Sequence, residues 1–369
     1  MSASGRVGSE REQRVLGIIE TARAKPPRFR DERITLAHGA GGRASQTLIE
    51  GLLVPAFAAA TPDGALAALG DAGAVRVDAG LLAISTDSFV VRPLRFPGGS
   101  IGELAVNGTV NDLAVSGARP LALSVSMILE EGLDAAVLRG EVGAIAAAAA
   151  AAGVEIVAGD TKVVERGAAD GMYLCTSGVG LRDARAAVAT DAIRPGDVVL
   201  LSGPIGEHGM AIMLARNEFD LDADIESDTC SLWPAVDALL EAAGGELHCM
   251  RDATRGGIAS ALCELARSSG VSVLVDEAAL PVAPAVRAAA ELLGIDPVHI
   301  ANEGRLVAFV APERAERALA ALRAVPGCDQ AATIGEVRAD PPGMVLVQTS
   351  FGGRRVMDQL VGDPLPRIC

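Results

Sequence analysis

Four aspartates in short polar motifs are the first candidates for chemistry in this chain. Each lies in a motif with small or glycine residues, at or near the expected end of a strand. A single loop aspartate usually caps a helix or makes a turn, but several carboxylates that converge from different strands can hold Mg²⁺ together with water and phosphate oxygens. The pattern therefore predicts a site for a metal and a nucleotide. The four residues are Asp87, Asp112, Asp160 and Asp252.

Two amides and a glycine-rich turn suit the phosphates of a nucleotide. Asn107 and Asn111 lie one helical turn apart, so they share one face of an expected helix with apolar neighbours. Buried amides need hydrogen-bond partners. The turn at 38–42, with Gly39, Gly41 and Gly42, precedes another expected helix and can form an anion-binding nest. It is not a P-loop, because no lysine follows its glycines.

A second helix start combines a cation with a place for an anion. Gly256 opens an expected helix directly after Thr254 and Arg255, and Asp252 lies just upstream. Backbone N–H groups at such a helix start favour phosphate. Glu303 lies in a short turn before a strand, a position at which glutamate is usually solvated.

Lysine is almost absent from the chain, since Lys25 and Lys162 are its only two lysines and arginine supplies the other basic side chains. A lysine retained in this background suggests a need for a compact ammonium that can lose its proton. Lys25 lies in a polar N-terminal extension. Lys162 follows Asp160 and Thr161, which makes it the candidate for chemistry.

The last residue, Cys369, is a thiol at the end of a short, stiff arm. Pro364 and Pro366 each fix φ and disfavour helix in the residue before them, and Gly362 supplies a pivot. A thiol with no residue after it can enter a narrow channel. The alternative is an incidental cysteine on a frayed terminus.

Two units of alternating helix and strand must position these residues, which predicts an α+β fold. A polar extension at 1–33, with a helix over 11–24, precedes an α/β domain at 34–185. The turn at Pro195-Gly196 marks the approach to an α+β domain at 186–355, and residues 356–369 form a mobile tail. Helices are expected near 100–116, 133–152, 209–217, 232–243, 256–269, 282–293 and 312–324, and strands at 74–77, 81–91, 120–129, 154–158, 172–179, 198–202, 271–275, 306–310, 332–337 and 344–349.

Composition limits the classes of partner. The net charge of −15 argues against broad binding of nucleic acid or acidic membranes. No apolar run reaches the roughly 18–20 residues that span a bilayer, and the alanine-rich stretch at 144–152 is too short. The six cysteines show no Cys-x-x-Cys spacing, so neither a zinc site nor a disulfide framework is indicated. We expect a cytoplasmic protein without nucleic-acid or membrane partners.

Together the motifs resemble the HypE family of hydrogenase maturation proteins, within the aminoimidazole ribonucleotide synthetase-like superfamily of ATP-binding proteins. The resemblance runs from about residue 34 to the last residue and leaves out the first 33. Its combination of motifs is highly specific. The matching segments are 34–42, 85–88, 107–113, 159–163, 251–257 and 366–369.

The resemblance implies an ATP-dependent carbamoyl dehydratase. HypF would place a carbamoyl group on the sulfur of Cys369, and ATP with Mg²⁺ would activate the carboxamide oxygen, so that elimination leaves an S-thiocyanate. Cyanide would then pass to iron on the HypC–HypD complex, for the active site of NiFe-hydrogenases. The N-terminal domains would pair in a homodimer, and the C-terminal domain would cover the nucleotide.

The resemblance also implies roles for the residues singled out above. A carboxamide oxygen is a poor leaving group until it is phosphorylated, and formation of a nitrile requires a base for the N–H protons. Lys162 and Glu303 would be the candidate bases, and the four aspartates would hold the metals. Nucleotide-binding residues would be Gly39, Gly41, Gly42, Asn107, Asn111, Thr161, Thr254, Arg255 and Gly256.

Other interpretations remain open at this point. A selenophosphate- or thiamin-phosphate-type kinase, or aminoimidazole ribonucleotide synthetase itself, would use comparable carboxylates without needing a terminal cysteine. A non-catalytic maturation scaffold would bind ATP only as a switch.

Overall fold

The computed structural model describes residues 28–31, 37, 42–53, 73–77, 80–216, 223–360, 362 and 367–369. The helix expected over 11–24, together with Gly39, Gly41, Pro364 and Pro366, lies outside the described residues.

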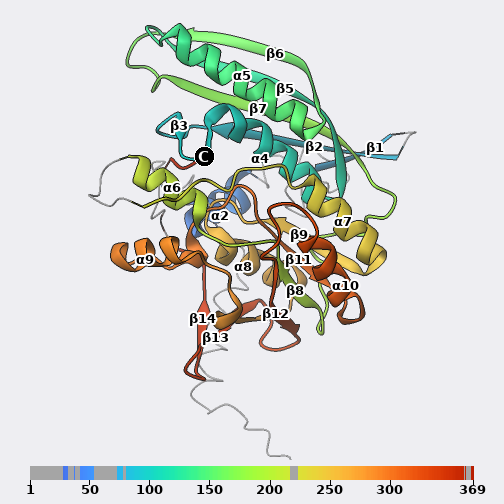
Figure 1. Cartoon of the computed structure of the whole chain (residues 1–369). Coiled ribbons are helices and arrows are strands. Elements are labelled where there is room, and N and C mark those ends of the chain that lie inside the picture. Colours follow the sequence, from blue (N-terminus) through green and yellow to red (C-terminus); the bar gives the residue numbers. More distant parts are fainter. Residues whose placement is uncertain are drawn as a thin grey trace, which may run out of the picture.

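A five-stranded sheet forms the first half of the chain, in the order β1-β2-β7-β5-β6 (Figure 1). β5 and β6 run parallel and are joined through α5 (Ala135–Ala152), because a parallel pair needs a crossover connection. The other neighbours are antiparallel. The strands are β1 (Gly73–Val77), β2 (Gly80–Phe89), β5 (Ala118–Glu130), β6 (Glu155–Val164) and β7 (Met172–Arg182), with a small hairpin of β3 (Arg95–Phe96) and β4 (Gly99–Ser100).

One face of this sheet is covered by α5 and by α4 (Ile101–Val115). α4 is apolar on nearly all sides, and Leu104, Val106 and Val110 are fully buried. A helix of this kind belongs in the centre of a core. α4 contacts β2 and β7 on one side and the second half of the chain on the other, so it carries site residues into the space between the halves.

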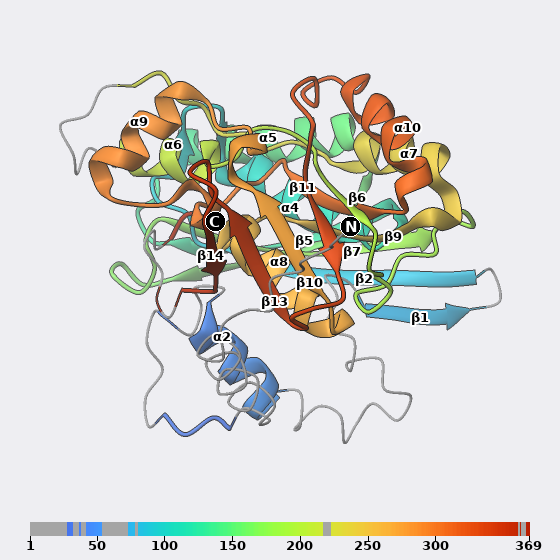
Figure 2. The ribbon, with the colours of Figure 1, turned by 90° about the horizontal axis from the view of Figure 1, so that it is seen from below.

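The second half is a seven-stranded sheet in the order β14-β13-β10-β12-β8-β11-β9 (Figure 2). α8 (Gly257–Ser269) packs on one face, and α7 (Trp233–Ala243) and α10 (Pro312–Arg323) pack on the other. Strands covered on both faces become continuously apolar, as β8 and β11 are. The strands are β8 (Val198–Leu201), β9 (Leu247–Asp252), β10 (Ser272–Asp276), β11 (Leu306–Val310), β12 (Ala332–Arg338), β13 (Met344–Gln348) and β14 (Arg354–Met357).

The remaining helices join the two halves. α6 (Glu207–Ala215) and α9 (Pro284–Leu293) contribute Met210, Ile212 and Val286 to a core that also contains α4 and Ile368 of the tail. The two halves therefore share a continuous hydrophobic core. Short helical segments occur at α2 (Arg43–Leu48), η2 (Ile49–Leu53), η3 (Gly244–Glu246), η4 (Glu277–Ala279) and η5 (Pro297–His299).

α5 is longer than its alanine-rich stretch suggests. Within the part of the chain that the structure describes, it is the one helix long and apolar enough to cross a membrane by length and composition. This differs from the expectation that no such segment exists. Because α5 packs against α4, and core helices can pass the same test, its composition alone is weak evidence for a span.

The α+β expectation is confirmed, and most predicted elements are present. Four strands were not predicted: β3, β4, β9 and β14. In addition, β6 does not stop at residue 158 but continues to Val164. The longer β6 matters for the site, because Asp160 and Lys162 lie within a strand rather than in a loop at its end.

Candidate active site

Carboxylates from both halves meet between α4 and the edge of the second sheet. Asp87 lies in β2 and accepts a hydrogen bond of 3.2 Å from the hydroxyl of Thr109 on α4. Burial raises the pKa of Asp87, against the hydrogen bonds from Thr109 and Asp112 and the charge of Arg255. Asp112 lies near the end of α4 rather than at a strand end, and Ser85 donates to it.

Glu303 contributes the most deeply buried carboxylate of this region. Its residue is 3% exposed, and its Oε1 is buried without a hydrogen-bond partner. Burial, with the nearby charges of Asp252, Asp228 and Asp87, raises the pKa of Glu303 well above its ordinary value, against the charge of Arg255. A glutamate in this state can hold or accept a proton near neutral pH. The expectation of a solvated turn residue is therefore wrong, and the role as a base fits its surroundings.

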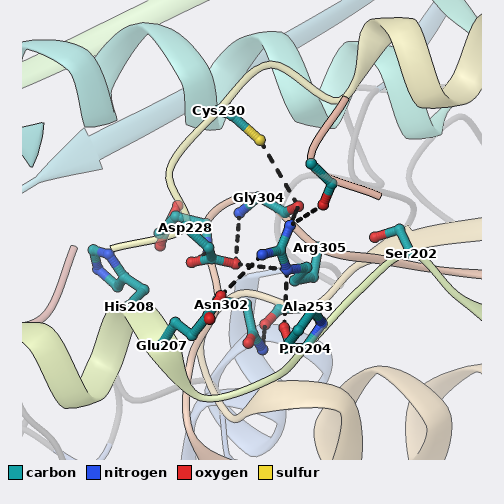
Figure 3. A network of polar contacts seen from close by, with 12 residues as sticks. Ser202, Pro204, Glu207, His208, Asp228, Cys230, Ala253, Asn302, Gly304 and Arg305 are labelled. Carbon is teal, nitrogen blue, oxygen red and sulfur yellow. Dashed lines mark hydrogen bonds and ion pairs between the residues drawn. The ribbon is translucent and has the colours of Figure 1, made fainter. Parts of the chain in front are cut away.

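Asp228 fixes the backbone on both sides of the Glu303 side chain, and Figure 3 shows its hydrogen bond with Gly304. Its two carboxylate oxygens accept from the N–H groups of Glu303 at 3.0 Å and Gly304 at 3.2 Å. The close contact between the backbones of residues 228 and 304 requires glycine at position 304, since a Cβ there would lie 1.9 Å from the carbonyl oxygen of Asp228. The buried Arg305 lies beside Asp228 at 3.6 Å and pairs with Glu207 at 2.9 Å. The turn is thus held rigidly in place.

Asn111 differs from its predicted role. Its side-chain amide donates to the carbonyls of Cys230, at 2.9 Å, and Glu303, at 3.1 Å, and its oxygen accepts from Leu232 N–H at 2.7 Å. These bonds occupy the amide with backbone from the second half, so Asn111 ties the halves together instead of presenting an amide to phosphate. Asn107 lies one turn earlier and donates to Thr229 at 3.2 Å.

Asp160 lies on the other face of the first sheet from Asp87. Asp87, Thr176, Val125 and Gly159 form one row across β2, β7, β5 and β6, and Thr176 and Val125 are buried on the side of α4. Asp160 is the next residue along β6, so the pleat turns its side chain to the opposite face. The prediction of a single four-aspartate cluster therefore differs from the structure.

Thr161 and Lys162 follow Asp160 along the edge strand β6. The Lys162 ammonium lies 3.1 Å from the Asp160 carboxylate, and these side chains are 68% and 61% exposed. The hydrogen bond from Lys162 lowers the pKa of Asp160. Within one chain, the structure does not bring Lys162 to Glu303.

The donor set near Asp87 fits a magnesium ion that is shared with phosphates. Among the described residues, no three His, Cys, Asp or Glu side chains are arranged to hold a metal by themselves. Mg²⁺ commonly takes one or two carboxylates and completes its shell with phosphate and water. The neighbouring carboxylates of Asp87 and Asp112 match that requirement.

The structure describes only some of the residues that are predicted to bind phosphate. Gly42 lies against the tail segment, where a Cβ would lie 2.3 Å from the carbonyl oxygen of Leu360. Gly39 and Gly41 lie outside the described residues, so their contact with phosphate stays a prediction. Thr254, Arg255 and Gly256 form the turn that opens the 13-residue helix α8, directly after Asp252 at the end of β9.

Cys369 lies between the two halves, next to the strand that carries Asp87 (Figure 1). An oxygen of its terminal carboxylate accepts a hydrogen bond of 3.2 Å from Val90 N–H, three residues beyond Asp87. That separation corresponds to about 10 Å along a strand. The terminal thiol is half-buried and the tail docks in the same interdomain region as the carboxylates.

Comparison with known proteins decides the family. Residues 69–182 match the N-terminal domain of AIR synthase related proteins, and residues 194–347 match their C-terminal domain. The carbamoyl dehydratase HypE of Rhodobacter capsulatus is 49% identical over 348 residues, which cover 92% of this chain and 99% of the relative. The chain belongs to the HypE family.

Solved HypE structures share the fold. HypE in complex with ATP has a TM-score of 0.75 at 45% identity and covers 91% of this chain and 100% of its own. HypE in the HypE–HypF complex has a TM-score of 0.79 at 42% identity, covering 84% and 99%. The resemblance seen in the motifs is confirmed, and the protein is an enzyme, a carbamoyl dehydratase of the HypE family.

Several residues of this HypE-type site were not predicted from the sequence. Asp228 and Arg305 hold the Glu303 turn, and Asn302 locks it further by accepting from Gly206 N–H and donating to the carbonyl of Ala253. Arg305 carried a usable signal, because an arginine directly before the apolar strand β11 must either reach solvent or find buried partners. Asp228 carried none, since it lies in an irregular polar segment.

Proposed function

We propose that this protein dehydrates an S-carbamoyl group on Cys369 to an S-thiocyanate at the expense of ATP, with Mg²⁺. The observation that carries the proposal is the docked terminal cysteine in the same interdomain region as the buried carboxylate of Glu303. The relatives named carbamoyl dehydratase and the HypE structure with ATP support it.

The reaction converts the S-carboxamide and ATP into the S-thiocyanate, ADP and phosphate; the carboxamide oxygen leaves on the phosphate, and the two N–H protons are released. ATP with Mg²⁺ supplies the phosphoryl group that makes the carboxamide oxygen a good leaving group. Asp87 and Asp112 would hold the Mg²⁺, and Arg255 at the start of α8 would meet phosphate. Glu303 would take a proton from the nitrogen as the C–O bond breaks and the C≡N bond forms.

The proposed partners follow from the family. HypF would supply the carbamoyl group, in line with the HypE–HypF complex, and the HypC–HypD complex would accept the cyanide. We place the protein in the cytoplasm, where thiols such as Cys369 stay reduced. We propose that the chain consists of an N-terminal extension at 1–33, an α/β domain at 34–185, an α+β domain at 186–355 and a tail at 356–369.

A measurement of phosphate release separates the enzyme from an ATP-switched scaffold. When the carbamoylated protein is supplied with Mg-ATP, we expect one phosphate for each dehydrated group. A scaffold would bind ATP and leave the carbamoyl group unchanged, which would refute the proposed reaction.

We also propose a homodimer built on the open face and outer edge of the first sheet. Ile84, Leu121 and Ile128 are 44%, 42% and 39% exposed, and Val157 and Val163 on the edge strand β6 are 64% and 67% exposed. Apolar area of this extent on a sheet usually marks a contact surface. We propose that a second copy of this chain covers these apolar residues.

Replacing Val157 with glutamate is expected to convert the dimer to a monomer in analytical ultracentrifugation, because a charge would be buried in the contact. Leu292→Glu is the matched control, since Leu292 is 71% exposed on α9, away from this sheet. An unchanged dimer in the Val157 variant would contradict the proposed surface.

Lys162 lies on the open face, so we propose that it acts across the contact between two copies. Lys162→Ala is expected to stall the reaction with the carbamoyl group in place. Mixing this variant with Cys369→Ser, which is also inactive, should restore turnover in mixed dimers. A mixture that stays inactive, although mass spectrometry shows mixed dimers, would contradict a role across the contact.

A further inference from the structure

The tip of the tail pairs with one edge of the first domain. Val90 N–H donates to a terminal carboxylate oxygen of Cys369 at 3.2 Å, and Arg92 N–H donates to the carbonyl of Arg367 at 3.3 Å. The two bonds follow an antiparallel register just beyond β2. The carbonyl of Ile368, which lies between these two, bonds to the second half of the chain instead.

The second half of the chain also binds the tail, through the carbonyls of Ile368 and Arg367. His208 Nε2, on the first turn of α6, lies 2.7 Å from the carbonyl oxygen of Ile368. Arg216, at the end of α6, donates to the carbonyl of Arg367 at 2.6 Å. Ile368 itself is 3% exposed and belongs to the shared core. The backbone oxygens of the last three residues are thus all bound, by groups from both halves.

The surroundings of His208 fix which nitrogen carries the proton. The ring is fully buried and lies edge-on to Phe96, with centroids 5.6 Å apart. Ser227 Oγ lies 2.7 Å from Nδ1 and accepts from Thr229 N–H at 3.2 Å. Burial lowers the pKa of His208, so the ring is neutral near pH 7. A carbonyl can only accept, so the single ring proton lies on Nε2, and Nδ1 accepts from the Ser227 hydroxyl.

We propose that His208 is a positioning residue for the dehydration, which holds Cys369 between the two halves by donating from Nε2 to the carbonyl of Ile368. The inference rests on the proposed role of Cys369. Since Ser227 precedes Asp228, one short segment sets both the imidazole that holds the tail and the backbone that places Glu303. Docking of the tail and placement of the base therefore depend on the same piece of chain.

Arg367 adds a constraint on the docked form. Its φ is +58°, in the left-handed region that residues with a Cβ rarely occupy. Its guanidinium pairs with Asp170 at 2.6 Å, and its Nε donates to the carbonyl of Val90 at 3.2 Å. This conformation must be held by contacts. Because the docked form depends on several contacts together, we expect loss of the His208 contact to raise the fraction of the protein whose tail is undocked.

The test is the rate at which iodoacetamide alkylates Cys369 in the full-length protein, followed by mass spectrometry of the C-terminal peptide. His208→Leu, which keeps an apolar side chain but removes the donor, is expected to raise the rate about tenfold. His208→Gln can place an amide N–H near the Nε2 position and should stay close to wild type. His299→Leu is the matched control, because His299 lies in η5, and should leave the rate unchanged.

Two further readouts keep the proposal testable. If His208→Leu does not fold, judged by thermal unfolding, Ser227→Ala removes the partner that fixes the ring and should raise the rate several-fold. In folded His208→Leu, kcat should fall while KM for ATP stays unchanged, because the tail and not the nucleotide is misplaced. Alkylation of His208→Leu at the wild-type rate would overturn the proposal. Alkylation is measured without ATP or carbamoyl phosphate, so an error about the cargo of Cys369 would leave this result intact.

Discussion

Cys369→Ser is expected to abolish formation of the thiocyanate while Mg-ATP binding stays at the wild-type level. The sulfur carries the group through the reaction, and a serine ester-type linkage would not replace it. Because no other thiol lies at the tip of the docked tail, we expect turnover to fall to background, by more than about 1,000-fold. The measurement is cyanide transfer in the reconstituted reaction, together with ATP binding by calorimetry.

Cys175→Ser is the matched control for this variant. Cys175 is also half-buried, but it lies in β7 rather than in the tail. We expect it to keep nearly full activity. Cyanide transfer by Cys369→Ser at the wild-type rate would show that another group carries the cargo.

Glu303→Gln is expected to lower turnover by about 100- to 10,000-fold, the range for loss of a positioned base. The substitution keeps the size of the side chain and the backbone bonds from Asp228, which do not involve the Glu303 carboxylate. The expected block is after carbamoylation, so the carbamoylated tail should accumulate. Glu277→Gln, at a partly exposed glutamate paired with Arg355, should change turnover little.

The same variant should change how stability depends on pH. The pKa of Glu303 is raised in the folded protein, so the folded state holds its proton more tightly than the unfolded chain does. Wild-type stability therefore falls as pH rises from the ordinary glutamate pKa toward the raised value. Glutamine does not titrate, so Tm of the variant minus Tm of wild type should grow with pH, by about 2–4 °C per kcal/mol. A difference that stays constant between pH 4 and pH 8 would contradict the placement of an ionisable Glu303 in this site.

Apolar segments allowed most of the fold to be predicted, because they report directly on burial. The continuously apolar β11 and the all-round apolar α4 are examples. Prediction from the sequence failed where contacts between distant parts of the chain determine the burial of a residue. Glu303 has the sequence context of an exposed turn, and only its packing against Asp228 and α4 shows that the turn is buried.

The face of a strand also depends on where the strand ends. Ending the strand at residue 158 placed Asp160 in a loop with the other aspartates, whereas its continuation to Val164 turns Asp160 to the open face. Asn111 shows a related limit. Its position on a buried face was predictable from spacing, but its partners, Cys230 and Glu303, lie more than a hundred residues later in the chain.

The most direct test follows the mass of the intact protein through one turnover. The protein is incubated with HypF, carbamoyl phosphate and ATP, and the C-terminal peptide is then isolated. We expect Cys369 first to gain one carbamoyl group and then, with Mg-ATP, to lose the mass of one water. A carbamoyl group found on another residue, or one on Cys369 that never loses water although ATP is consumed, would contradict the account.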